Sequence, residues 1–144
     1  MTADLSALIA RLEAAEVGGR ELDGAVARLF GWHRVEPRFS RNKHGGWIAP
    51  EDFIGLYSDG APKLDSLHGT TIHRDPPRLT QSLDAALALA ERVLPGWQIG
   101  MWTTKHNAVG SVLREYGGAF DATASTPALA LCIAILRAKQ GEGE

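Results

Sequence analysis

The strongest structural signal in the chain is the stretch Ser125-Thr126-Pro127-Ala128-Leu129-Ala130-Leu131-Cys132-Ile133-Ala134-Ile135-Leu136-Arg137-Ala138. Thr126 offers a capping oxygen, and Pro127 suits the first helical position because its missing N–H needs no partner there. From Ala128 to Leu136 hardly any residue is polar, so the pattern predicts a helix buried at the centre of the fold. Cys132 is the single cysteine of the 144-residue chain, and we expect a buried thiol.

Regular periodicity continues on the N-terminal side of this helix. An alternating strand is predicted at 97–103, and two further strands are predicted at 109–116 and 120–124, with Gly117-Gly118 as the turn between them. Ser82 or Thr80 caps a predicted helix that ends at Pro95-Gly96. Near the N-terminus, apolar spacing predicts one helix that is ended by Gly18-Gly19 and a second from about Arg20 to Phe30.

The segment from 33 to 78 lacks this periodicity and holds five of the seven prolines and four of the five histidines. Only Ile48, 53–57 and 70–72 have the β-branched or aromatic character of short strands. We therefore expect one domain over 1–140 with an irregular insertion at about 33–78, and a mobile tail at 141–144. The order of elements predicts an α+β fold with a small antiparallel sheet covered by helices.

Composition narrows the classes of partner. A net charge of -2 and a pI near 6.2 do not favour a protein that coats nucleic acid, although a local basic patch stays open. The chain has no run of 18 apolar residues and no signal-peptide pattern, which predicts a cytoplasmic protein without a membrane partner. Homo-oligomer formation is left open.

Five short motifs carry a resemblance to a known family. They are Arg20-Glu21-Leu22-Asp23, Gly31-Trp32, the stretch 77–86, Pro95-Gly96-Trp97 and the start of the buried helix at 126–132. Together these motifs resemble the phage ABA-sandwich domain family. The resemblance implies a three-layer α/β/α sandwich and a phage or prophage origin. It implies no activity, because that family is defined by its fold.

The segment 33–47 is the main candidate for ligand binding. Guanidinium groups bind phosphate in a bidentate manner and aromatic rings stack on bases, so cations interleaved with rings suit a nucleotide. Its predicted ligand residues are Arg34, Arg38, Arg41, Lys43 and Trp47, and His68, His73 and Lys105 complete the candidate set. The alternative is a solvated loop whose rings fold back onto the core.

The four tryptophans receive different interpretations. Trp32, Trp97 and Trp102 follow or lie within ordered apolar patterns, so we expect them to be core anchors. Trp47 is the exception, because its surroundings of glycine and charged residues offer little core. We therefore expect its ring to be available as a stacking surface.

These observations favour a non-catalytic phage or prophage accessory protein that binds a small anionic ligand, such as a nucleotide or a nucleotide-derived signal, in the host cytoplasm. No metal and no cofactor are predicted. The alternative is a protein-interaction module, an inhibitor or assembly factor, that docks on a host or phage protein through Trp47, Phe53 and Tyr57. A phosphodiesterase using His68 and Thr70 is less favoured, because that chemistry needs two His-x-Thr motifs and the sequence has one.

Overall fold

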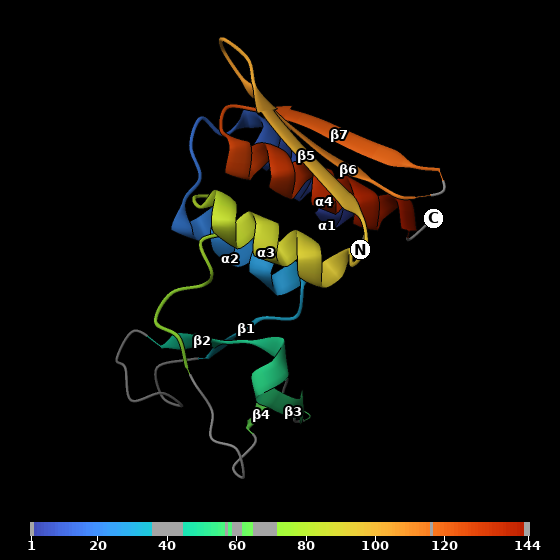
Figure 1. Ribbon diagram of the computed structural model, residues 1–144. Coiled ribbons are helices and arrows are strands. Elements are labelled where there is room, and N and C mark those ends of the chain that lie inside the picture. The colour runs from blue at the N-terminus through green and yellow to red at the C-terminus, as the bar shows by residue number, and fades with distance from the viewer. Residues whose placement is uncertain are drawn as a thin grey trace. The chain divides into compact units, whose positions relative to one another are not determined.

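The structure is a computed structural model that describes residues 2–35, 45–56, 58, 62–64, 72–115 and 117–142. Its internal contacts divide the chain into two compact units (Figure 1). The first unit comprises 1–23 and 78–144, and the second unit comprises 24–77. The second unit overlaps the segment predicted as an irregular insertion.

The first unit contains three of the four described helices and one antiparallel sheet. Helix α2 (Arg20–Leu29) begins in this unit and continues into the second. The other elements are α1 (Thr2–Ala14), α3 (Leu83–Val93), β5 (Gln98–Thr103), β6 (Ala108–Leu113), β7 (Ala119–Ala124) and α4 (Pro127–Glu142). The sheet order is β5-β6-β7, with Met101 opposite Gly110 and Gly110 opposite Ala122.

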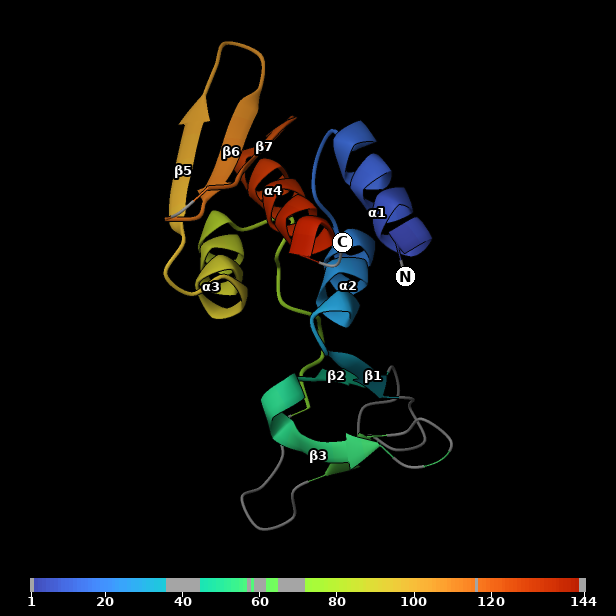
Figure 2. The ribbon, with the colours of Figure 1, turned by 90° about the vertical axis from the view of Figure 1, so that its right-hand side faces the viewer.

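Helix α4 is the centre of the first unit, as its sequence predicts. Every residue from Ala128 to Leu136 is buried. On one side α4 packs against β6 and β7, and elsewhere it contacts α1 and α3 (Figure 2). Thr126 caps it, because the Leu129 N–H donates to the threonine Oγ1. The helix runs to Glu142, two residues into the segment predicted as a mobile tail, while residues 143 and 144 lie outside the described residues.

The two faces of the sheet differ. Directly paired residues in antiparallel strands project on the same face, so the helix-facing rows include Val112, Ala122 and Ala124, which are all buried. The opposite face carries Trp102 and Leu113, which are both exposed. The predicted α+β class is therefore confirmed. The three-layer α/β/α arrangement is not confirmed, because the contacts of the described residues place α4 on one face of the sheet.

The second unit contains two small antiparallel pairs. β1 (His33–Val35) pairs with β2 (Gly46–Ile48), and β3 (Phe53–Leu56) pairs with β4 (Pro62–Leu64) after a short 3₁₀ turn at Pro50–Asp52. The predicted strands around Ile48 and 53–57 match β2 and β3. Of the strand predicted at 70–72, only Ile72 is described, and it lies outside any strand.

None of the four described helices combines the length and the apolar character that a bilayer crossing requires.

Candidate functional site

Three of the predicted ligand residues form one cross-strand row in the second unit. Arg34 of β1 lies opposite Trp47 of β2 in the ladder, and Trp47 lies opposite His73 in an isolated antiparallel bridge. The bridge is closed by two backbone hydrogen bonds, from the Trp47 N–H to the His73 carbonyl at 2.6 Å and from the His73 N–H to the Trp47 carbonyl at 2.7 Å. Because cross-strand partners share a face, the three side chains start from one face of this patch.

The central member of the row differs from its sequence prediction. Trp47 is only 5 % exposed, whereas Arg34 and His73 are exposed. The Trp47 ring packs against the second-unit part of α2, because a Cβ on Gly24 would lie 3.0 Å from two atoms of the indole. The prediction of an open stacking surface at Trp47 is therefore wrong. Glycine at position 24 supplies the space that the sequence around Trp47 did not indicate.

Two residues outside the predicted set complete the cluster. The guanidinium carbon of Arg28 lies 5.3 Å from the centre of the Trp47 ring, within the range of a cation–π contact. The rings of Trp32 and His73 lie 5.5 Å apart at 57°. Trp32 is half-buried, so it presents the accessible aromatic surface that Trp47 does not. Arg28 lies four residues after Gly24, about one turn along α2, and no pattern near it in the sequence indicated its contact with Trp47.

The indole N–H of Trp47 is buried and has no hydrogen-bond partner among the described residues. A buried donor without an acceptor costs about 1–3 kcal/mol, and native proteins normally satisfy such groups through protein, water or ligand. The Trp47 N–H therefore places one buried hydrogen-bond donor among the cations and aromatic rings of this cluster.

Charge is distributed unequally between the two units. The segment 24–77 contains seven Lys and Arg against six Asp and Glu, whereas the rest of the chain contains eight against eleven. Four of the five histidines also belong to 24–77. The formal net charge is therefore +1 over 24–77 and -3 over the rest of the chain.

The remaining predicted ligand residues do not join this row. Arg38, Arg41, Lys43 and His68 lie outside the described residues. Lys105 belongs to the first unit, where it is exposed on the loop between β5 and β6. That loop is closed by the Thr104 N–H, which donates to the Asn107 carbonyl at 2.7 Å, so Lys105 occupies the tip of a tight turn.

The two tryptophans of the first unit, Trp97 and Trp102, have opposite environments. Trp97 is half-buried, with its ring 6.2 Å from that of Phe120 and the Arg114 guanidinium 4.9 Å from its centre. Trp102 is 52 % exposed on the open face of the sheet, so its prediction as a core anchor is wrong. The alternation of residues 97–103 already assigns Trp102 to the face of the strand opposite to Met101, so its exposure could have been predicted.

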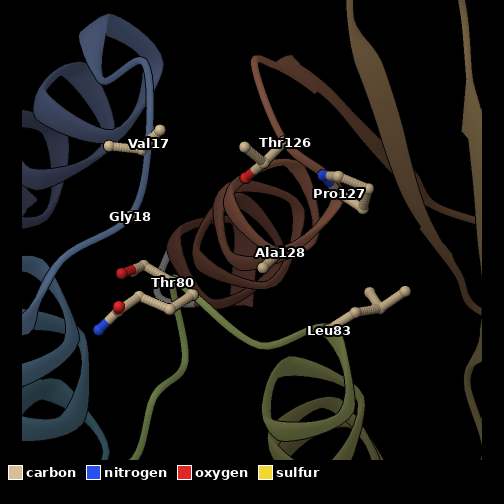
Figure 3. Close-up of a pocket in the computed structure, with 8 residues that line it drawn as sticks. Val17, Gly18, Thr80, Leu83, Thr126, Pro127 and Ala128 are labelled. Atoms are coloured by element: carbon tan, nitrogen blue, oxygen red, sulfur yellow. The ribbon is translucent and has the colours of Figure 1, made fainter.

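A cavity of about 340 Å³ opens in the first unit where α3 and α4 begin (Figure 3). Its walls are Val17, Gly18, Thr80, Gln81, Leu83, Thr126, Pro127 and Ala128. No wall residue is charged. The three polar side chains all make hydrogen bonds within the protein: Thr126 caps α4, and Thr80 and Gln81 bind Asp23. The cavity therefore offers no cation to an anionic ligand, and a buried carboxylate lies beside it.

That carboxylate is the centre of a polar cluster in the first unit. Asp23 is 1 % exposed and accepts from the Thr80 N–H at 2.7 Å, from the Thr80 hydroxyl, and from Gln81 Nε2 at 2.7 Å. The Thr80 hydroxyl also accepts from the Gly19 N–H at 3.1 Å. A Cβ at Gly18 would collide with the Thr80 carbonyl, so glycine permits this close approach. The cluster fastens the start of α2 to the segment before α3.

Cys132 confirms the prediction of a buried thiol. It is fully buried in α4, and its Sγ donates to the Leu79 carbonyl at 3.1 Å. Burial, and secondarily the nearby Asp23 carboxylate, raise the pKa of the thiol from 9.0 to about 12. Because the thiolate is the reactive species, the thiol is inert in the folded protein near neutral pH.

We expect the native protein to resist a chromogenic thiol reagent at pH 8 and to react at once in denaturant. The raised pKa also means that the thiol stays protonated to a higher pH in the folded protein than in the unfolded chain. The thiol's contribution to stability is thus complete below pH 9 and falls as pH rises toward 12, by at most about 1.4 kcal/mol per unit. Urea titrations of the wild type and Cys132→Ala between pH 8 and 10.5 measure how steeply the free energy of unfolding of each falls with pH, and the wild type should fall more steeply. Rapid labelling of the native protein by the thiol reagent would contradict the burial of Cys132.

Comparison of the chain with models of protein families, with curated proteins and with solved structures returned no match. The resemblance to the phage ABA-sandwich family therefore stays a prediction.

Proposed function

We propose that the protein is a non-catalytic phage or prophage accessory protein that binds a small anionic ligand, a nucleotide or nucleotide-derived signal, in the host cytoplasm. The observation that carries the proposal is the row of Arg34, Trp47 and His73, because it brings the exposed side chains of Arg34 and His73 from separate segments onto one face. Binding of this kind would sequester a host signal without turnover.

Each part of the cluster has a role that its position supports. Arg34 provides a guanidinium for a phosphate group, since its planar donors match phosphate oxygens. Trp32, half-buried beside His73, provides the surface on which a planar base stacks. Buried Trp47 holds the row together, and its contact with Arg28 keeps a second guanidinium beside the patch. The small excess of cations in 24–77 favours an anion over a neutral ligand.

The first experiment asks whether a ligand exists. The purified protein is denatured, the released material is searched by mass spectrometry, and a panel of mono-, di- and cyclic nucleotides is then titrated by calorimetry. We expect binding that weakens as salt is raised from 50 to 500 mM, because phosphate contacts near the surface are screened. No released ligand and no heat across the panel would refute the proposal.

The second experiment locates the site. Arg34→Ala should weaken binding about tenfold to a hundredfold, the usual effect of losing a hydrogen bond to a charged group. Lys105→Ala removes one exposed cation from the first unit and serves as the matched control, with no change expected. Equal losses in both variants would place the ligand elsewhere. Recovery of a partner protein whose binding is lost on substitution of Phe53 or Tyr57 would favour the protein-interaction module instead.

A further inference from the structure

The face of the sheet opposite to α4 carries an ordered set of side chains. Helix α4 packs on the other face, where Gly110 meets its backbone. Directly paired residues share a face of a sheet, and alternate residues of each strand return to it. The register of β5, β6 and β7 therefore gives the open face three rows, which are Gln98-Leu113-Ala119, Gly100-Ser111-Asp121 and Trp102-Val109-Thr123.

The indole of Trp102 rests on small residues of this face. Its Cζ3 would lie 3.7 Å from a Cβ at Gly100, which is an ordinary van der Waals distance. Ser111 is paired with Gly100 in the same row and is 5 % exposed, so the floor beside the ring is low and closed. Trp102 itself is 52 % exposed. The ring is thus supported by the sheet and open to solvent over about half of its surface.

Polar side chains share this face with the ring. Thr123 lies in the row of Trp102, Asp121 lies one row away and Gln98 lies two rows away, and all three are exposed. Neighbouring strands are about 4.8 Å apart, so Trp102 and Thr123 start about 10 Å from each other with Val109 between them. None of the residues in the three rows is basic.

We propose that this face binds a neutral oligosaccharide, with one sugar ring stacked on Trp102 and the next lying over Val109 toward Thr123 and Asp121. The C–H groups on the face of a sugar ring carry a slight positive charge, and the face of an indole is negative. Sugar hydroxyls both donate and accept hydrogen bonds, a carboxylate accepts them, and a threonine hydroxyl does both. The open face therefore matches a sugar at its apolar surface and at its polar edge.

Other classes of ligand fit this face less well. A nucleotide or nucleic acid needs cations for its phosphates, whereas this face offers the carboxylate of Asp121. A protein interface is built around clustered apolar anchors. The exposed large apolar side chains of the three rows are Trp102 and Leu113, which lie two rows apart on different strands. One isolated ring among polar groups favours a small polar ligand with an apolar face.

The test is a titration of isotope-labelled protein with maltotetraose, cellotetraose and chitotetraose, followed by NMR. A small open surface binds weakly, so we expect the Trp102 indole N–H to shift with a dissociation constant on the order of 1 mM for at least one of these sugars. Trp102→Ala should weaken binding about tenfold or more, because the stacking ring is lost. Asp121→Ala should weaken it about twofold to tenfold, as expected for one hydrogen bond.

Val17→Ala is the matched control. It removes an apolar side chain that is 70 % exposed and does not belong to the three rows, so binding should be unchanged. Equal losses in Val17→Ala and Trp102→Ala would overturn the placement of the site. Absence of shifts with all three sugars at about 20 mM, well above the expected dissociation constant, would overturn the proposal itself.

A second measurement uses the wild type alone and does not depend on any variant being folded. Saturation of the aromatic protons of the protein should be transferred mainly to the C–H protons of one sugar ring, the one stacked on Trp102. Equal transfer to every ring of the sugar would contradict stacking. The sugar site and the nucleotide site are independent, because they rest on different units of the chain, so the failure of one leaves the other standing.

Discussion

Asp23→Ala is expected to lower the free energy of unfolding by about 3–5 kcal/mol, against a total of roughly 5–15 kcal/mol for a domain of this kind. The substitution leaves the buried Thr80 N–H without its acceptor, and it leaves the Thr80 hydroxyl with only the Gly19 carbonyl at 3.3 Å. An unpaired buried donor costs more than the net value of the bond it lost. Thermal and urea unfolding should both show the loss, with a midpoint lower by about 10 °C.

The matched control for Asp23→Ala is Asp84→Ala. Asp84 is also an acid in the first turn of a helix, but it is exposed. Its removal should cost only the favourable interaction with the helix dipole, about 0.3–1 kcal/mol. Asp23→Asn, which keeps an acceptor oxygen, should fall between the two. Similar losses for Asp23→Ala and Asp84→Ala would mean that the hydrogen bonds of Asp23 to Thr80 do not stabilise the first unit.

Gly110→Ala is expected to be the second most harmful substitution, at about 1–3 kcal/mol. A Cβ at Gly110 would lie 2.9 Å from the carbonyl carbon of Ala130 and 2.9 Å from the amide nitrogen of Leu131. These are backbone atoms inside α4, so they cannot rotate away as a side chain can. The helix must shift off the sheet, and Gly110→Val should therefore be worse than Gly110→Ala.

Gly100→Ala provides the comparison on the neighbouring strand. An added Cβ at Gly100 makes only ordinary contacts, and removing a glycine reduces the freedom of the unfolded chain. The free energy of unfolding of Gly100→Ala should be unchanged or slightly raised. Urea unfolding of both variants measures the difference, and equal stabilities would show that α4 does not pack tightly on β6.

The order of elements in the first unit could be predicted because the signals are local. Ser82 caps α3 by accepting from the Ala85 N–H, Thr126 caps α4, and both residues of the Gly117-Gly118 turn have positive φ. Each of these patterns lies within a few residues of the element that it defines. Caps, turn glycines and apolar periodicity can therefore be recognised in a single sequence.

Contacts between distant segments could not be predicted in this way. Asp23 has the position of an ordinary acid in the first turn of a helix, and nothing near it indicates that Thr80, 57 residues later, is its partner. β1 was missed because its three residues, His33–Val35, stand in a charged context and form a strand only through pairing with β2. Propensity is weak for so short a strand, and tertiary pairing decides it.

The two tryptophan corrections have one origin. Trp47 was expected to be open because its sequence neighbours are glycine and charged residues, but burial is decided by what packs on it from elsewhere, here Gly24 and Arg28. Trp102 was expected to be buried because its neighbours are apolar, although its position in the strand alternation assigns it to the open face. Composition around a residue is thus a poorer guide to burial than its place in the pleat.

The hydrogen bonds between Asp23 and Thr80 affect which insertions and deletions the sequence of this protein can tolerate. They hold together the two places at which the chain departs from the first unit and returns to it. Closing a longer loop costs only about 0.6 kcal/mol for each doubling of its length. The segment between α2 and Arg78 can therefore be lengthened or shortened at little entropic cost, provided that the contacts of Trp47 with Gly24 and Arg28 are kept. The first unit can therefore keep its helices and sheet while the length of that segment varies.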